Sequence, residues 1–142
     1  MKRVSIAAAV ASLAVSTILA AQAPASAADT LRCKDGETYM MNVMVSSHPY
    51  WVPVYQGFKQ AAAAFGCKTA FSGTPEYDIT KQVASFEQDL VTKPAGILLH
   101  PMQADPFIEP INAAIASGTA VVTFAADSPK SKRTAYITSD NV

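Results

Sequence analysis

The chain has 142 residues and a formal net charge of zero, because 11 Lys and Arg residues balance 11 Asp and Glu residues. This balance provides no electrostatic footprint for nucleic acid, and an apolar content of 50% argues against intrinsic disorder. The length supports one domain at most, or a fraction of a larger one. The sequence contains no EF-hand loop, P-loop, HExxH or GxSxG motif. The composition therefore predicts a globular unit of the size of an α/β domain, and it indicates no particular function.

Residues 1–27 have the three parts of a secretory signal peptide. Lys2 and Arg3 form a positive start, residues 4–21 are almost wholly apolar, and Ala25 and Ala27 supply the small residues of a cleavage site. The alternative is a transmembrane anchor, since the apolar stretch is about long enough to span a bilayer. Ala and Ser dominate the stretch, however, rather than Leu and Ile. We expect cleavage after Ala27 and export of residues 28–142 without insertion in the membrane.

Cys33 and Cys67 are the two cysteines of the chain. In an oxidising compartment they can form one disulfide. Cys33 lies just before the first expected strand and Cys67 opens the second, so both belong at the same end of neighbouring strands. The alternative is a pair of reduced, buried thiols. We expect no metal site, because neither cysteine lies in a CxxC pair or close to a histidine.

Strands and helices alternate along the exported chain. Apolar runs predict strands over residues 38–45, 67–71, 95–99, 120–124 and 135–138. Apolar residues at helical spacing predict helices over residues 52–65, 79–92 and about 108–117. Asp78 is a good N-cap for the second helix, and either Asp105 or Glu109 caps the third. Gly66 and Gly118 end the first and third helices.

Strands joined by single helices imply right-handed crossovers and a doubly wound α/β fold with a parallel sheet. Helices must cover both faces of the sheet, because the strands are apolar on both faces. The simplest strand order, counted along the chain, is 2-1-3-4-5. Ligands of such sheets bind beyond the carboxyl ends of the strands, where the order reverses. Here that place is the cleft between residues 46–51 and residues 100–105, with residues 72–77 and 125–129 beside it.

The first of these loops carries His48, Tyr50 and Trp51 close together. An aromatic ring with a polar edge suits a ligand that has apolar C–H faces and hydroxyl edges, such as a sugar or polyol. Alternatively, Tyr50 and Trp51 staple the first helix with one ring turned into the core, and His48 caps that helix. Two further residues face the same cleft. His100 contacts the ligand or braces its loop, and Asp127 accepts ligand hydroxyls or caps the Ser-Pro turn that follows it.

Three longer runs of residues resemble one known family. The run MVSSHPYWVPVYQGFKQAAAAFGCKTAF resembles the first β-α-β unit of periplasmic sugar-binding proteins of the ribose- and galactose-binding class. The resemblance continues through TKQVASFEQDLVTKPAGILLHPMQADPF and GTAVVTFAADSPKSKRTAYITSDNV, and so covers about residue 38 to the end. It implies a type I periplasmic binding fold, in which residues 28–142 form the N-terminal lobe of a two-lobe protein and stop at the hinge.

The resemblance also implies a function. A monomeric periplasmic protein of this class captures a small ligand, closes its two lobes and docks on the membrane permease of an ABC importer, without a cofactor and without catalysis. His48, Tyr50 and Trp51 match the positions that contact the sugar. The family's usual Asp and Arg after the fourth strand match Ala125 and Ala126 here, so Asp127 is the nearest acid. That departure indicates a larger, differently substituted or less polar ligand.

Three functions other than transport are alternatives for this sequence. A binding protein of the same fold can present its ligand to a chemoreceptor or sensor kinase. An exported sugar-acting enzyme would use His48 or His100 with Asp127 as acid and base, but no nucleophile stands beside either histidine. A sugar-responsive repressor shares the fold, but the signal segment argues against it.

Overall fold

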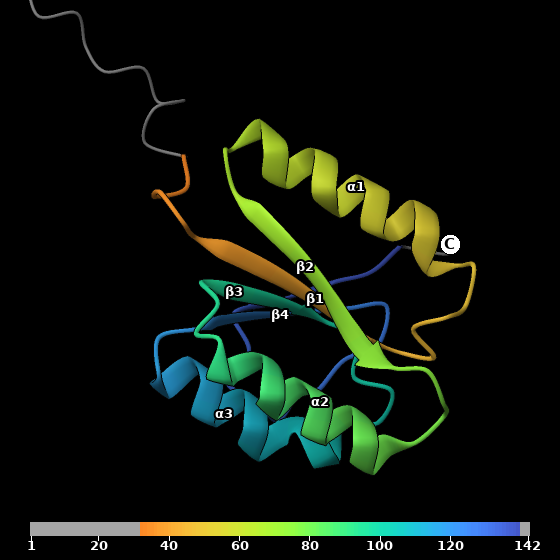
Figure 1. Cartoon of the computed structure of the whole chain (residues 1–142). Coiled ribbons are helices and arrows are strands. Elements are labelled where there is room, and N and C mark those ends of the chain that lie inside the picture. Colours follow the sequence, from red (N-terminus) through yellow and green to blue (C-terminus); the bar gives the residue numbers. More distant parts are fainter. Residues whose placement is uncertain (1–31, 140–142) are drawn as a thin grey trace, which may run out of the picture.

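The computed structural model describes residues 32–139, so the expected signal peptide over residues 1–27 lies outside the described residues. The chain forms a sheet of five parallel strands in the order β2-β1-β3-β4-β5, as predicted (Figure 1). The strands are β1 (Thr38–Met44), β2 (Lys68–Thr74), β3 (Gly96–Leu99), β4 (Ala120–Phe124) and β5 (Ala135–Ile137). Their carboxyl ends share one edge of the sheet, which we call the carboxyl edge, and their amino ends share the other, the amino edge.

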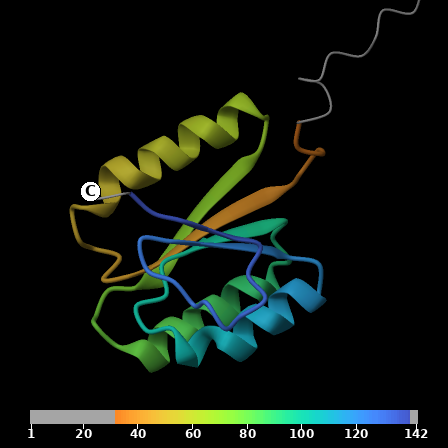
Figure 2. The same cartoon turned by 180° about the vertical axis from the view of Figure 1, so that it is seen from behind.

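Helices lie on both faces of the sheet, in unequal numbers. Helix α1 (Trp51–Ala64) lies on one face, and α2 (Ile79–Val91) and α3 (Ile108–Ala116) lie side by side on the other (Figures 1 and 2). The predicted fold class, an α/β sheet with helices on both faces, is therefore confirmed. Within residues 32–139, no helix combines the length and the apolar character that crossing a bilayer requires.

The starts of the helices differ from one another. Asp78 caps α2 as predicted, since its side chain accepts a hydrogen bond of 3.0 Å from the Lys81 main-chain N–H. The predicted cap of α3 is wrong, because neither Asp105 nor Glu109 caps it. A 3₁₀ turn, η2 (Asp105–Phe107), runs directly into α3 and replaces a side-chain cap. The Asp105 carboxylate instead pairs with Lys130 at 3.3 Å.

Two apolar clusters hold the helices to the sheet. The cluster beneath α2 and α3 is the larger, and its buried members are Met40, Phe86, Ile97, Leu99, Phe107, Ile111, Ala114 and Val121. The cluster beneath α1 has four buried members, Met41, Val43, Trp51 and Phe124. Successive residues of β1 contribute to opposite clusters because side chains alternate across a strand. Phe65, the last residue of the first predicted helix, lies just beyond the end of α1 and is 44% exposed.

The inner face of α2 is more polar than its pattern predicts. Phe86 is fully buried, and the polar residues Gln82 and Asp89 are buried on the same face. The Asp89 carboxylate accepts hydrogen bonds from Asn42 of β1 at 2.8 Å and from Ser72 of β2 at 2.5 Å. Burial nevertheless raises the pKa of Asp89, because desolvation of the charged form outweighs these two bonds. A polar cluster thus fastens α2 to the two strands.

Strand β2 is longer at its carboxyl end than predicted. Ser72 to Thr74 were expected in a loop, but they continue the pairing with Asn42 to Met44 of β1. Gly73 makes the extension possible. Its φ of 129° is one that side chains rarely allow, and a Cβ added there would lie 1.8 Å from the Val43 carbonyl oxygen. The loop after β2 therefore begins only after Thr74.

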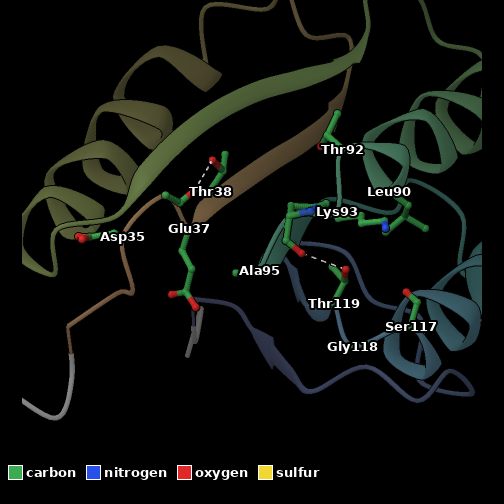
Figure 3. A pocket seen from close by; sticks show the side chains of 12 residues that line it. Asp35, Glu37, Thr38, Leu90, Thr92, Lys93, Ala95, Ser117, Gly118 and Thr119 are labelled. Atoms are coloured by element: carbon green, nitrogen blue, oxygen red, sulfur yellow. Dashed lines mark hydrogen bonds between the residues drawn. The ribbon is translucent and has the colours of Figure 1, made fainter.

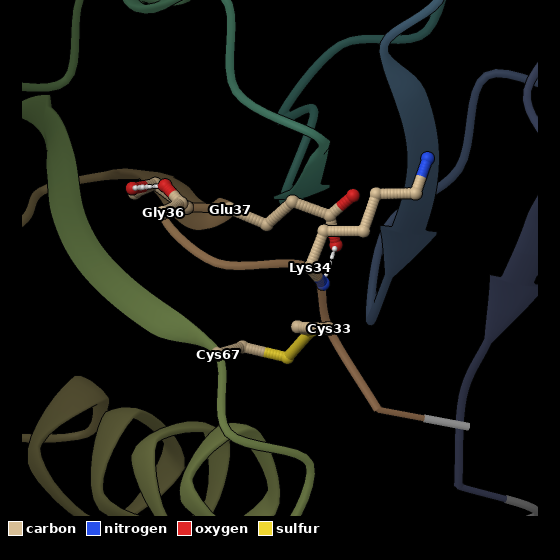
Figure 4. Close-up of a disulfide and its surroundings, with 6 residues drawn as sticks. Cys33, Lys34, Gly36, Glu37 and Cys67 are labelled. Carbon is tan, nitrogen blue, oxygen red and sulfur yellow. Dashed lines mark hydrogen bonds between the residues drawn. A yellow bond between two sulfur atoms is a disulfide. The ribbon is translucent and has the colours of Figure 1, made fainter. Parts of the chain in front are cut away.

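Cys33 and Cys67 form a disulfide at the amino edge (Figure 4). Their Cα atoms are 5.3 Å apart, and the bond closes a loop with a sequence separation of 34 residues. Main-chain bonds of 2.9 Å flank it, from the Cys33 N–H to the Phe65 carbonyl and from the Cys67 N–H to the Ala62 carbonyl. The disulfide thus joins the start of the described chain to the end of α1 and the start of β2.

Candidate functional site

A hollow of about 310 Å³ lies at the carboxyl edge, beyond the ends of β1, β3 and β4. Eight residues line it: Met44, Val45, His48, Tyr50, Trp51, His100, Met102 and Ala125. The structure therefore brings together four of the five predicted site residues, from two separate loops. Asp127 is not among the lining residues. The hollow lies where the strand order reverses, which is where parallel sheets of this kind bind ligands.

Trp51 is the first residue of α1, and its side chain is only 7% exposed. Its indole Nε1–H lies 3.1 Å from each of the carbonyl oxygens of Met44 and Val45. The ring packs edge-on against His100 and Phe124, with centroid separations of 4.9 and 5.9 Å. Trp51 is therefore the ring turned into the core, and one part of it still lines the hollow. Ligand contact by Trp51 stays a prediction.

His48 and Tyr50 are the exposed members of the same loop. Tyr50 is 56% exposed, and its ring meets Trp51 edge-on at 4.9 Å. The His48 Nδ1 atom accepts a hydrogen bond of 3.1 Å from the Tyr50 main-chain N–H, just before α1 begins. His48 and Trp51 also line a smaller hollow of about 170 Å³ beside α1, together with Ser46, Ser47, Val52, Tyr55, Gln56 and Phe71. The two hollows thus share a wall made of one imidazole and one indole.

His100 follows β3 directly, and its ring is half-buried. Its Nδ1 atom is buried without a hydrogen-bond partner among the described residues. Burial lowers the pKa of His100, so the imidazole is neutral at pH 7. Gln82 donates a hydrogen bond of 2.7 Å from its side-chain amide to the His100 carbonyl oxygen. Sequence reasoning missed Gln82, although helical spacing places residue 82 on the same inner face as Phe86.

Asp127 lies outside the hollow and braces the turn that follows β4. One carboxylate oxygen accepts from the Thr123 hydroxyl at 2.7 Å and from the Ser128 N–H at 2.8 Å, and the other accepts from the Arg133 guanidinium at 2.8 Å. Burial raises the pKa of Asp127, but the bonds from Thr123, Arg133 and Ser128 outweigh it and lower the pKa overall. This geometry agrees with the second of the two predicted roles, in which Asp127 caps the Ser-Pro turn that follows it. Its contact with a ligand stays a prediction.

Two residues that line the hollow at the carboxyl edge have left-handed backbone conformations that the sequence does not predict. Val45 has φ 51° and Ala125 has φ 59°, just after β1 and β4. A Cβ disfavours this region, and a β-branched side chain does so most strongly. Hydrogen bonds hold both residues there, since the Val45 carbonyl accepts from the Trp51 indole and the His48 main-chain N–H, and the Ala125 N–H donates to the Ile137 carbonyl at 3.0 Å. Strain of this kind gathers at functional sites.

A second hollow, of about 640 Å³, lies at the amino edge (Figure 3). It is lined by the turns that precede β1, β3 and β4, including Thr38, Lys93 and Thr119, and no aromatic side chain lines it. The Thr119 hydroxyl donates to the Pro94 carbonyl at 2.9 Å and so links the turn before β4 to the turn before β3. The hollow at the amino edge is therefore lined mainly by turns, whereas aromatic and imidazole rings make up half of the lining at the carboxyl edge.

The carboxyl-edge hollow can bind an uncharged ligand through an exposed phenol ring, two imidazoles and apolar side chains. Its lining contains no Ser, Thr, Cys, Lys, Asp or Glu that could act as a nucleophile or carboxylate base. Among residues 32–139, no three His, Cys, Asp or Glu side chains are grouped as metal ligands.

The model of the periplasmic binding protein domain matches residues 39–142. The chain belongs to this family. Its members are periplasmic or extracellular solute-binding proteins. None of the curated protein sequences matches the chain significantly.

Solved structures of sugar-binding proteins are similar to the chain. A sugar-binding protein of a sugar ABC transporter from Bacillus halodurans is 32% identical, with a TM-score of 0.69 over 70% of this chain and 34% of that one. The arabinose-binding protein AraP from Geobacillus stearothermophilus is 31% identical, with the same TM-score and coverage. GanP, a glucose-galactose-binding protein from Geobacillus stearothermophilus, is 26% identical, with a TM-score of 0.70 over 76% of this chain and 39% of that one. The chain thus spans about a third of the length of these proteins.

Proposed function

We propose that this chain is the N-terminal lobe of an exported sugar-binding protein that delivers a sugar or sugar-like molecule to the permease of an ABC importer. Residues 1–27 are the signal peptide, residues 28–142 are the lobe, and the protein is a periplasmic monomer without a cofactor. The observation that carries the proposal is the hollow at the carboxyl edge, where Tyr50 and two imidazoles face one cavity. Relatives that are sugar-binding proteins of ABC transporters support the same function.

The lobe supplies one side of the ligand site and a second lobe supplies the other. The exposed ring of Tyr50 offers a flat apolar surface for the C–H face of a sugar. His48 and the neutral His100 offer ring nitrogens that donate to or accept from hydroxyl groups. Ligand contacts that form only when the lobes are closed favour closure, and closure creates the surface that the permease recognises. The isolated lobe lacks these contacts and therefore binds its ligand more weakly than the two-lobe protein.

The test is a thermal-shift screen of the two-lobe protein against monosaccharides, polyols and sugar acids. A ligand present at 100 times its dissociation constant adds about 2.7 kcal/mol to the free energy of unfolding, and so raises the melting temperature visibly. Tyr50→Ala is expected to remove this shift, because Tyr50 is exposed and its loss leaves the core intact. Phe65→Ala is the matched control, since Phe65 is 44% exposed and lies at the amino edge, opposite the hollow.

Two results would contradict this function. One is the absence of any shift across the panel, and the other is equal affinity of the isolated lobe and the two-lobe protein. Recovery of the ligand unaltered after long incubation separates binding from enzymatic turnover, since an enzyme would convert it.

A further inference from the structure

The hollow at the carboxyl edge is poor in polar side chains. Four of its eight lining residues are aliphatic or thioether side chains, Met44, Val45, Met102 and Ala125. The other four are aromatic or imidazole rings, and none of the eight is Asp, Glu, Asn, Gln, Lys or Arg. A fully hydroxylated sugar presents a polar group at nearly every ring carbon. This lining therefore offers fewer polar partners than such a sugar has hydroxyl groups.

Several nearby polar atoms are already engaged within the chain. The indole N–H of Trp51 is directed at the carbonyls of Met44 and Val45, and His48 Nδ1 accepts from the Tyr50 main chain. Both carboxylate oxygens of Asp127 accept bonds from neighbouring groups of its own turn. The polar groups left for a ligand are the Tyr50 hydroxyl, the second nitrogen of His48 and the His100 imidazole. All three belong to the β1 and β3 loops, so the β4 side of the hollow, where Ala125 lies, is apolar.

We propose that the ligand is an uncharged deoxy sugar whose deoxygenated carbon lies against Met102 and Ala125, the two exposed apolar residues of the lining. This inference rests on the proposed function and names the ligand class of the same site. A hydroxyl group buried against these two side chains would lose its water without gaining a partner, which is unfavourable. A C–H or methyl group in the same place is buried favourably. A sugar acid is disfavoured further, because none of the eight residues with which this lobe lines the hollow is Lys or Arg.

Ala125 determines this preference on the β4 side. Its φ of 59° is a conformation in which Asn and Asp are several-fold enriched and Ala is not. The backbone would thus accept a polar side chain at this position with less strain than the alanine it carries. An asparagine at residue 125 would add an amide to the apolar wall and provide a partner for the hydroxyl group that the wall otherwise excludes.

The experiment compares sugars that differ by one oxygen atom, using isothermal titration of the two-lobe protein. The pairs are L-fucose with L-galactose, L-rhamnose with L-mannose and 2-deoxy-D-ribose with D-ribose, and D-galacturonate is the acidic probe. The tightest ligand is expected to be a deoxy sugar that binds at least about tenfold more tightly than its parent, because an unpaired buried hydroxyl weakens binding by about that factor. A parent sugar or the uronate that binds within about tenfold of the tightest deoxy sugar overturns the proposal and leaves the sugar-binding function standing. Failure of every sugar to bind overturns both.

Two variants of Ala125 test the assignment of the apolar wall. Ala125→Asn is expected to reduce the preference for the deoxy member of the pair by about tenfold, since the added amide pairs with the parent's hydroxyl. Ala125→Gly relaxes the same backbone without adding a polar group, so it is expected to leave the preference unchanged. Both variants fold, because both suit a positive φ. An unchanged preference in Ala125→Asn, or an equal change in both variants, overturns the role of Ala125.

Discussion

Residues with a positive φ occur at both edges of the sheet, but their residue types differ between the two edges. At the amino edge, positive φ falls mainly on glycine, at Gly36, Gly66 and Gly118, and at one lysine, Lys93. At the carboxyl edge it falls on Val45 and Ala125 as well as on Gly73. Glycine adopts this conformation without strain, whereas a residue with a Cβ must be held in it by its surroundings. The turns of the amino edge therefore carry little backbone strain, whereas hydrogen bonds hold Val45 and Ala125 in strained conformations at the carboxyl edge.

The two edges are also held together by different kinds of bond. The amino edge is joined by the Cys33–Cys67 disulfide and by main-chain bonds such as that from Ala95 to the Thr38 carbonyl. The carboxyl edge is joined by side chains, among them Trp51 on the Val45 carbonyl and Gln82 on the His100 carbonyl. Side chains that hold strained loops in place also shape the hollow between them. The two edges therefore differ in the type of bond: a disulfide and main-chain bonds hold the amino edge, whereas side chains that donate to main-chain carbonyls hold the carboxyl edge.

The largest effect is expected from Gly73→Ala at the carboxyl edge. The new Cβ would lie 1.8 Å from the Val43 carbonyl oxygen, so β1 and β2 must separate there. We expect a loss of more than about 5 kcal/mol in the free energy of unfolding. The control at the amino edge is Gly118→Ala, where φ is 93° but no atom lies within 4 Å of the added Cβ. It is expected to cost about 1–2 kcal/mol, for strain alone. Urea unfolding followed by circular dichroism measures both, and similar losses would contradict the close approach of the strands.

The next effect is that of Trp51→Ala. The variant removes a buried ring from the core beneath α1 and removes the indole N–H that is directed at the Met44 and Val45 carbonyls, of which Val45 keeps the bond from the His48 main-chain N–H. The expected loss is about 3–5 kcal/mol, as for other buried aromatic residues. Tyr50→Ala on the same loop is expected to change stability by less than about 0.5 kcal/mol, because the ring is exposed. Thermal unfolding of the two variants makes the comparison, and equal losses would show that Trp51 is not the residue that holds this edge.

A comparable but slightly smaller effect is expected when the amino edge loses its disulfide. Replacing both Cys33 and Cys67 with Ser opens a loop with a sequence separation of 34 residues. Loop entropy predicts a loss of about 4 kcal/mol, and measured losses more often lie at about 2–4 kcal/mol. Calorimetry of the wild-type chain with and without a reductant checks the value. Ligand affinity measured below the melting temperature is expected to stay unchanged, since the bond lies at the edge opposite the hollow; reduced affinity would contradict the independence of the two edges.

The same division explains what the sequence could predict. The strand order, the Asp78 cap and the ends of two helices at Gly66 and Gly118 follow from local signals, because residue type and backbone agree there. The meeting of the two loops at the carboxyl edge follows from topology. The left-handed conformations of Val45 and Ala125 could not be predicted, because neither residue type favours them and the hydrogen bonds that hold them leave no signal in the residue pattern.

Burial of polar groups was the other unpredictable feature. Gln82 and Asp89 are polar residues on the inner face of α2, and both are buried against polar partners on other elements. A periodic pattern identifies the apolar members of an inner face, but it does not show which polar side chains there find partners on other elements. The cap of α3 failed for a related reason, since the preceding 3₁₀ turn made a side-chain cap unnecessary.

The smallest effect concerns two carboxylates with opposite pKa shifts. The pKa of Asp89 is raised by burial, so its contribution to stability grows as the pH falls from above that raised pKa towards the ordinary value of 3.8. The pKa of Asp127 is lowered by its bonds to Thr123, Arg133 and Ser128, despite partial burial. Its contribution is present above pH 3.8 and is lost as the pH falls through its lowered pKa. Hydrogen bonds thus compensate the burial of the Asp89 carboxylate only in part, whereas they more than compensate that of Asp127 in the turn at the carboxyl edge.

Asp89→Asn and Asp127→Asn separate these two cases. Asn keeps the shape of the side chain and stays neutral. The free energy of unfolding of Asp89→Asn, relative to that of the wild type, should therefore be highest at pH 7 and should decrease as the pH approaches 4. Asp127→Asn should destabilise the chain by a constant amount between pH 7 and pH 4.5, because Asp127 remains charged in both states over that range. Urea unfolding at pH 7, 5.5 and 4.5 measures both dependences. A relative stability of Asp89→Asn that does not change with pH would mean that the Asn42 and Ser72 bonds compensate the buried charge fully, and the contrast between interior and edge would then rest on backbone strain alone.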